Sequence, residues 1–190
     1  MYREDAIKDH FNTISSTIIK ICQQHQIKEL ILGYNINWKT GVNIGSNNNR
    51  KFYQVPYRKL IHMLFYKGEN SGIKVVENEE SYTSKCDALA LENVGFNHTY
   101  VGQRVKRGMF QSARGVLINA DVNGAINIMR KYVTKTYTFL ANVLDTIVQN
   151  TPLSRLCNPI KIKNAKSHPM IFQGRLRGTV TVPLLQRTSA

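Results

Sequence analysis

The sequence has few acidic residues and few cysteines. Asp and Glu number 12 against 26 Lys and Arg, so the 190 residues carry a formal net charge of +14. A basic excess of this size indicates a polyanionic partner, usually nucleic acid. The three cysteines, Cys22, Cys86 and Cys157, show no Cys-x-x-Cys spacing. This pattern disfavours a disulfide framework and favours a reducing, cytoplasmic location.

Long apolar runs are also missing. No stretch of 18 or more apolar residues occurs, which excludes a transmembrane helix, and no membrane partner is expected. The N-terminus, MYREDAIKDH, lacks the apolar core of a signal peptide. The hydrophobic fraction of 42%, with nine Tyr and seven Phe, argues against a disordered basic tail. The length suits about one domain with a buried core.

The hydrophobic pattern predicts a mixed α/β fold. Apolar residues at helical spacing predict a first helix over 7–21, and Glu29–Asn35 and Ile73–Val76 are typical of short buried strands. A helix beginning near Pro56 lies between the strands, which indicates a crossover joining two parallel strands. The glycines in residues 92–115 predict that this segment is a loop-rich insertion. From Asp121, helical spacing predicts one long helix that ends at Pro152.

Because acids are scarce, the places where they gather are informative. Three of them lie in the run Glu77-Asn78-Glu79-Glu80, at the end of the second predicted strand. The carboxyl ends of strands are where ligand sites of open α/β sheets lie. A carboxylate cluster there favours a hard divalent cation such as Mg²⁺ or Mn²⁺. The alternative is a solvated corner between strand and loop.

A second polar cluster begins the long predicted helix. Asp121 falls at the helix start, where an Asp side chain can cap free N–H groups. Asn123 and Asn127 are four residues apart and so share one helix face, and neither is needed for capping or for the core. A polar stripe next to an acid indicates a site. The alternative is a plain N-cap at Asp121.

Positive charge gathers between Gly102 and Gly115. Four cations and one aromatic residue form a basic, glycine-flanked loop in this prediction: Arg104, Lys106, Arg107, Arg114 and Phe110. Such cations contact backbone phosphates, and an aromatic ring can stack on a base. The alternative is a solvated surface loop.

Taken in order, five blocks of the sequence resemble one protein family. They are LILGYNINWK (30–39), NNNRKFYQVPYRKLI (47–61), GIKVVENEESYTSKCD (72–87), GQRVKRGMFQSARG (102–115) and INADVNGAINIMRK (118–131). Together they resemble the C-terminal half of TnpB-type proteins, the OrfB products of a bacterial insertion-sequence family and relatives of the type V CRISPR effectors. The resemblance covers residues 1–135.

This resemblance implies an RNase H-like (RuvC) fold, of which the chain carries only the C-terminal part. It also implies an RNA-guided, transposon-encoded DNA endonuclease with DNA and guide RNA as partners. Such nucleases use two divalent metals, Mg²⁺ or Mn²⁺, held by an Asp, a Glu and a second Asp. Asp121 matches the last acid. Most of the family carries the Glu in a block that reads GYN at 33–35 here. In the matching subgroup the acid lies in the ESYTSK block, so Glu80 is assigned as catalytic and metal-binding, with Glu79 as the alternative.

Two family features are missing. No block like Gly-Ile-Asp-Leu-Gly, which carries the first catalytic Asp, occurs in the sequence. The family's four-cysteine zinc ribbon is degraded over 86–115, with Cys86 its only trace. Since His98 is the only other soft ligand between the acidic clusters, no zinc is expected. We therefore expect an N-terminal segment or a second chain to supply the first Asp, and the isolated chain to be inactive.

The resemblance also divides the chain. Residues 1–135 are expected to form the C-terminal part of the nuclease domain, and 136–190 the helix end and a basic, proline-containing tail. Contacts to nucleic acid are assigned to four cations and one amide: Arg104, Lys106, Arg107, Arg114 and Asn123. The alternatives from other classes are a catalytically inactive nucleic-acid-binding protein or regulator, and a basic accessory protein of a ribonucleoprotein particle.

Overall fold

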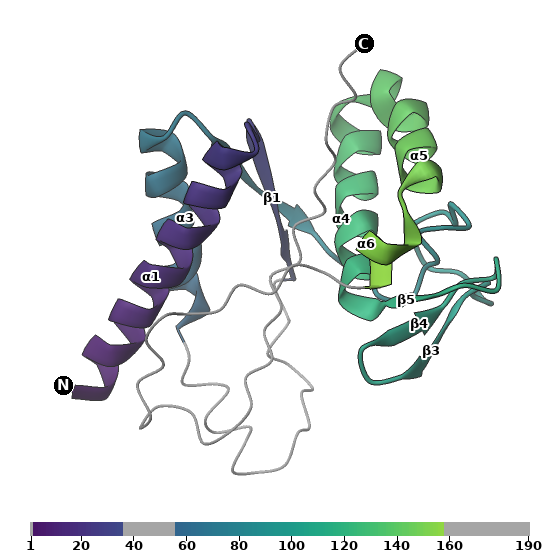
Figure 1. Cartoon of the computed structure of the whole chain (residues 1–190), viewed down its shortest axis with the longest axis horizontal. Coiled ribbons are helices and arrows are strands. Elements are labelled where there is room, and N and C mark those ends of the chain that lie inside the picture. Colours follow the sequence, from purple (N-terminus) through teal and green to yellow (C-terminus); the bar gives the residue numbers. More distant parts are fainter. Residues whose placement is uncertain (1, 36–55, 158–190) are drawn as a thin grey trace. The chain divides into compact units, whose positions relative to one another are not determined.

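The computed structural model describes residues 2–35 and 56–157 (Figure 1). These residues belong to two compact units, with the boundary between Glu77 and Asn78 rather than near residue 135. Of the described residues, the N-terminal unit holds 2–35 and 56–77, and the C-terminal unit holds 78–157. The GYN block at 33–35 and the helix start at Pro56 lie in the described part, whereas most of the predicted tail lies outside it. No helix in the described ranges is long and apolar enough to cross a membrane.

The N-terminal unit contains two helices and two paired strands. In chain order these are α1 (Tyr2–Gln24), β1 (Glu29–Tyr34), α3 (Tyr57–Asn70) and β2 (Lys74–Glu79). β1 and β2 are hydrogen-bonded neighbours, and α1 packs along α3 (Figure 1). The predicted helices and strands are therefore confirmed, with Pro56 at the N-cap of α3. β2 continues past its predicted end at Val76 into the acidic run.

One lysine connects the two helices of the N-terminal unit. Lys67 on α3 donates hydrogen bonds from Nζ to Asn12 Oδ1 at 2.7 Å, and to Ser15 Oγ and Ser16 Oγ at 2.8 Å each. Around this contact, Phe11 and Leu64 are buried in the core. Partial burial lowers the pKa of Lys67, and the hydrogen bonds compensate for water that the ammonium group has lost.

The C-terminal unit begins with a three-stranded antiparallel sheet. Its strands are β3 (Gln103–Lys106), β4 (Met109–Gln111) and β5 (Leu117–Asn119), in the order β3-β4-β5. The insertion predicted as a loop over 92–115 thus contains a β-hairpin over 103–111, which turns at Gly108 with a left-handed φ of +78°. Strands this short do not produce a clear alternation of apolar and polar residues, so the sequence pattern missed two of them.

Four helical segments follow the sheet. They are α4 (Ala120–Thr136), the 3₁₀ turn η1 (Thr138–Leu140), α5 (Ala141–Asn150) and α6 (Leu153–Cys157). The prediction of one long helix is wrong, because the chain leaves helical geometry at Tyr137 (φ −133°, ψ 58°) and α5 packs against α4. The Thr-rich segment 134–138 has low helix propensity. Apolar spacing continues across the break because α4 and α5 face the same core.

That core lies between the sheet and the helices. Its members come from β4, β5, α4, α5, α6 and the segment before β3, and the largest are Leu89, Phe110, Ile118, Val122, Ile126, Leu144, Val148 and Leu156. Residues 141–157, which were expected to belong to a helix end and tail, therefore contribute to the folded unit.

Candidate functional site

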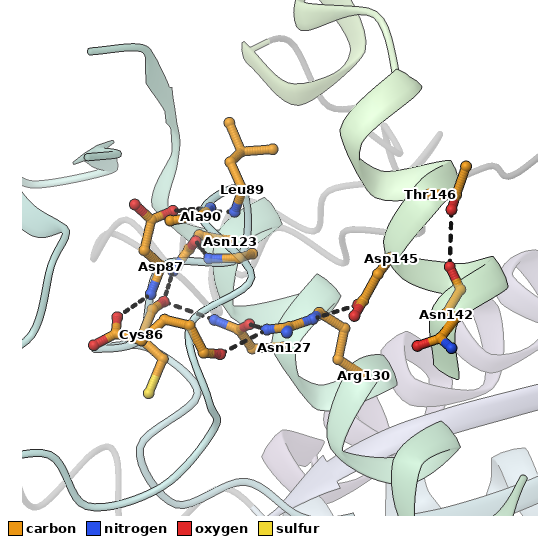
Figure 2. Close-up of polar contacts among 12 residues, drawn as sticks. Cys86, Asp87, Leu89, Ala90, Asn123, Asn127, Arg130, Asn142, Asp145 and Thr146 are labelled. Atoms are coloured by element: carbon orange, nitrogen blue, oxygen red, sulfur yellow. Dashed lines mark hydrogen bonds and ion pairs between the residues drawn. The ribbon is translucent and has the colours of Figure 1, made fainter. Parts of the chain in front are cut away.

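A polar stripe on α4 fixes the segment that follows β2. The Nδ2 of Asn123 donates to the Cys86 carbonyl at 2.8 Å, and its Oδ1 accepts from the Ala88 N–H at 3.0 Å. The Nδ2 of Asn127 donates to the carbonyls of Thr83 and Cys86 at 3.0 and 2.7 Å. Figure 2 shows both amides pointing at the chain around Cys86. Asn123 is 0% exposed, so the prediction that it contacts nucleic acid is wrong.

Arg130 is a third member of this stripe, seven residues after Asn123. Its Nε donates to Asp145 Oδ1 on α5 at 3.0 Å, and its Nη1 donates to Asn127 Oδ1 at 3.1 Å and to the Glu92 carbonyl at 2.9 Å (Figure 2). The sequence analysis missed Arg130. Its signal was the spacing of 123, 127 and 130 on one helix face.

Asp87 is a buried carboxylate that joins two turns of the C-terminal unit. Its Oδ1 accepts from the N–H groups of Leu89 and Ala90 at 3.0 and 3.2 Å. Its Oδ2 accepts from Ser112 Oγ and from the Ala113 N–H, both at 2.7 Å. These donors lie near the two ends of the region 86–115, which was expected to be a degraded zinc ribbon. The sequence analysis missed Asp87, although it is the acid next to the only cysteine of that region.

Cys86 itself is buried against the loop that follows. Its Sγ lies 3.5 Å from the Asn93 carbonyl and 3.7 Å from the Gly95 carbonyl. Burial raises the pKa of the Cys86 thiol, which keeps it protonated and poorly suited to bind a metal. The side chain therefore serves the packing of the loop.

The two candidate glutamates differ in their surroundings. Glu79 is paired with Lys131 Nζ and also accepts hydrogen bonds from Ser81. Burial alone would raise the pKa of Glu79, but these partners outweigh it and lower the pKa. Glu80 is half-buried, and burial together with the neighbouring charge of Glu79 raises its pKa. Within the described ranges, the Glu80 carboxylate has no hydrogen-bond or ion-pair partner.

Asp121 lies exposed in the first turn of α4 and does not cap the helix. The N-cap is Asn119, whose Oδ1 accepts from the N–H groups of Asp121 and Val122 at 2.8 and 3.2 Å. The alternative of a plain N-cap at Asp121 is therefore wrong. The negative side chain lies at the positive end of the helix dipole, where a negative charge is stabilising.

Glu80 and Asp121 lie beside the same helix. Asn78 Nδ2 donates to the Ile128 carbonyl at 3.1 Å, which places the chain just before Glu80 next to α4. Asp121 lies seven residues before Ile128, which is about 10 Å along the axis of α4, so the contacts of the described residues do not themselves bring the two carboxylates together. Oxygen donors of this kind suit Mg²⁺ or Mn²⁺. The part of the chain with described positions contains no group of three or more Asp, Glu, His or Cys side chains arranged to hold a metal.

The predicted phosphate-binding cations all reach the surface. Arg104 and Lys106 lie on β3, Arg107 at the hairpin turn and Arg114 in the turn after β4, and each is exposed. Phe110 is different, since it sits opposite Ile118 in the core and is 1% exposed. The prediction that Phe110 stacks on a base is therefore wrong, because the ring is packed in the core of the unit and lies against Gly102.

Comparison with known proteins identifies a family and a viral protein to which this chain is similar. Residues 57–128 match the protein family described as Cas12f1-like, TNB domain. The TnpB-like protein ORF457 of Acidianus two-tailed virus is 28% identical over 153 residues, which are 80% of this chain and 30% of the viral protein. Over the matched residues this chain is similar to TnpB-type proteins and to the Cas12f1-like TNB domain family. The relationship inferred from the sequence blocks is thereby confirmed.

The fold of this TnpB relative also matches a solved structure. A chain of the Cas12f1–sgRNA–target DNA complex superposes with a TM-score of 0.51 at 20% identity, over 66% of this chain and 34% of that chain. At this identity the likeness concerns the fold. The TnpB relative spans about a third of the length of either protein.

Proposed function

We propose that this chain forms the C-terminal RuvC portion of an RNA-guided DNA endonuclease. Its relationship to TnpB-type proteins and the likeness of its fold to Cas12f1, which was solved with sgRNA and target DNA, support this proposal. The observation that carries it is the Glu80 carboxylate, which is half-buried and has no partner among residues 2–35 and 56–157, near α4 with the exposed Asp121 in its first turn. Among the described residues of this chain of net charge +14, neither carboxylate makes a hydrogen bond or an ion pair.

Glu80 and Asp121 would hold Mg²⁺ or Mn²⁺ together with a third carboxylate from outside the described residues. Their oxygen donors fit a hard cation, and the half-buried Glu80 gains from a positive partner, which residues 2–35 and 56–157 do not supply. Lys131 neutralises Glu79 and so leaves Glu80 as the available ligand of the pair. When bound, divalent metals in such sites activate water and stabilise the leaving oxygen of a phosphodiester.

The exposed cations of the β3–β4 hairpin would hold DNA and guide RNA. Arginine and lysine contact backbone phosphates without reading sequence, and they position the nucleic acid on the protein. In this proposal the hairpin binds phosphates, and Glu80 and Asp121 provide metal ligands.

The test is DNA cleavage by the chain after it has been supplied with a segment that carries the missing Asp and with guide RNA. The isolated chain should leave DNA intact with Mg²⁺ or Mn²⁺, and the complemented assembly should cut it. In that assembly Glu80→Gln or Asp121→Asn should abolish cutting while RNA and DNA binding persist. Glu79→Gln is the matched control and should have a mild effect.

Other results would redirect the assignment. Loss of cutting in Glu79→Gln but not in Glu80→Gln would move the metal ligand by one residue. Cutting that survives all three substitutions would contradict the role of these acids. A complemented assembly that binds RNA and DNA but never cuts would favour the inactive nucleic-acid-binding alternative.

A further inference from the structure

Three aromatic side chains form a continuous row on the surface of the C-terminal unit. The ring centroids of Tyr82 and Phe96 are 6.0 Å apart, and those of Phe96 and His98 are 5.3 Å apart. Both pairs meet edge to face, at interplanar angles of 73° and 76°. Phe96 is nevertheless 68% exposed and Tyr82 39% exposed. Adjacent aromatic rings that are this exposed to solvent are typical of a binding surface rather than of a core.

The backbone under this row is held in place before any ligand arrives. Tyr82 adopts a left-handed φ of +68°, which is uncommon for a residue other than glycine, and its carbonyl accepts from the N–H groups of Lys85 and Cys86. Burial of the ring does not explain this conformation, since the ring faces solvent. Uncommon backbone geometry of this kind gathers at ligand sites.

The loop that carries Phe96 and His98 is fixed by one carboxylate. Glu92 Oε1 accepts from Asn97 Nδ2 at 3.1 Å and from the Val101 N–H at 3.3 Å. Glu92 Oε2 accepts from the Asp87 N–H at 2.7 Å, which ties the loop to the core of the unit. A platform ordered in advance loses little conformational entropy when a ligand binds.

We propose that Tyr82, Phe96 and His98 form a stacking platform for unpaired bases of single-stranded nucleic acid. This proposal rests on the proposed function, in which the chain binds nucleic acid. Exposed rings offer stacking surface to any base, whereas the bases of a duplex are already stacked on one another. The net charge of +14 favours a polyanion over other ligands with flat apolar rings. The platform supplies the base contact that the buried Phe110 does not.

The experiment compares two single-stranded probes on the full 190-residue chain. One is an oligothymidylate and the other an abasic oligonucleotide of the same length, so both carry the same phosphates. Fluorescence anisotropy should show wild type binding the thymidylate about tenfold more tightly than the abasic probe. Phe96→Ala should remove most of this difference, and Phe96→Trp should retain it. Phe139→Ala is the matched control, because Phe139 is 79% exposed in the same unit and lies outside the row.

The outcomes separate this proposal from the proposed function. Equal wild-type affinity for both probes would overturn the platform and leave phosphate binding intact. Loss of the preference in Phe139→Ala as well as in Phe96→Ala, or its persistence in Phe96→Ala, would also overturn the platform. Absence of binding to both probes would overturn nucleic-acid binding itself, and the platform with it. Since Phe96 is exposed, its replacement should leave the far-UV circular dichroism spectrum unchanged.

Discussion

The hydrogen bonds of Asp87 join two turns of the chain, as the metal ion does in a zinc ribbon. A zinc ribbon joins two turns through four ligands around one ion. Here four N–H and O–H donors from two turns converge on one buried carboxylate. A buried charge is tolerated when it accepts several hydrogen bonds. The unit can therefore keep these two turns together although Cys86 is the one cysteine left in the region.

We expect Asp87→Asn to destabilise the C-terminal unit by about 2 kcal/mol or more, because an amide nitrogen would face donors that then have no acceptor. Asp121→Asn makes the same chemical change at an exposed position without a capping role and should be nearly silent. Urea denaturation of both variants measures the difference. Equal losses in the two variants would contradict the role given to Asp87.

Glu79 and Glu80 should affect stability in opposite directions as pH changes. The raised pKa of Glu80 means that the folded state favours its protonated form, so stability falls as pH rises from the ordinary value of 4.5 through the raised pKa. The lowered pKa of Glu79 means that its contribution is present above 4.5 and is lost as pH falls through the lowered pKa.

At neutral pH in the presence of a chelator, Glu80→Gln should therefore raise the melting temperature and Glu79→Gln should lower it slightly. Below the ordinary pKa of a glutamate, at about pH 4, the Glu80→Gln gain should vanish because wild-type Glu80 is then protonated as well. Thermal melts across this range provide the measurement. A Glu80→Gln variant less stable than wild type at neutral pH would show that the carboxylate has a partner in solution.

At the scale of elements, α3 approaches β2 so closely that only glycine fits at the contact. A Cβ on Gly68 would lie 2.4 Å from Val75 Cγ2 and 2.9 Å from the Ile73 carbonyl oxygen. The Ile73 carbonyl oxygen belongs to the backbone, so a change of side-chain rotamer cannot relieve the clash. Gly68 thus sets the distance between the helix and the strand that leads into the acidic run.

Gly68→Ala should lower the free energy of unfolding by about 1–3 kcal/mol through overpacking, despite the better helix propensity of alanine. Gly124→Ala on α4 is the matched control, since a Cβ there meets nothing within 4 Å. That variant should be more stable by about 0.5–1 kcal/mol. Chemical denaturation of both variants is the measurement, and a stabilised Gly68→Ala would disprove the close contact.

At the scale of the whole molecule, charge determines how the chain meets its partners. The net charge of +14 draws any polyanion toward the protein, whereas the exposed hairpin offers three cations on one short element. Affinity from phosphate contacts falls as salt rises, by an amount that depends on the number of contacts.

Replacing Arg104, Lys106 and Arg107 together with Ala should reduce the slope of log affinity against log salt by about 2–3 for duplex DNA. Replacing the exposed Lys8, Lys20 and Lys28 of the N-terminal unit removes the same charge and should change the slope far less. Filter binding over a range of salt concentrations measures both. Similar slopes in the two variants would indicate that the phosphate contacts lie outside the hairpin.

The sequence alone determined the local elements and the chemical character of the chain. Helical spacing in α1, the apolar run of β1 and the proline before α3 are contained in short segments, and these predictions are confirmed. The basic excess and the ordered blocks were sufficient to identify the TnpB relationship. The acids at the end of β2 and at the start of α4 were also visible as candidates, because the whole chain has only 12 acids and three of them gather at 77–80.

Only the tertiary structure decided which of these side chains face solvent and which face one another. Asn123 and Phe110 are residue types that often contact nucleic acid. Here, however, residues distant in sequence bury both side chains. The break at Tyr137 escaped detection because α4 and α5 face one core and keep one apolar spacing. Asp87 gains its role from Ser112 and Ala113, which lie far along the chain. Periodicity is a local property, whereas burial and hydrogen bonding depend on segments that meet only after folding.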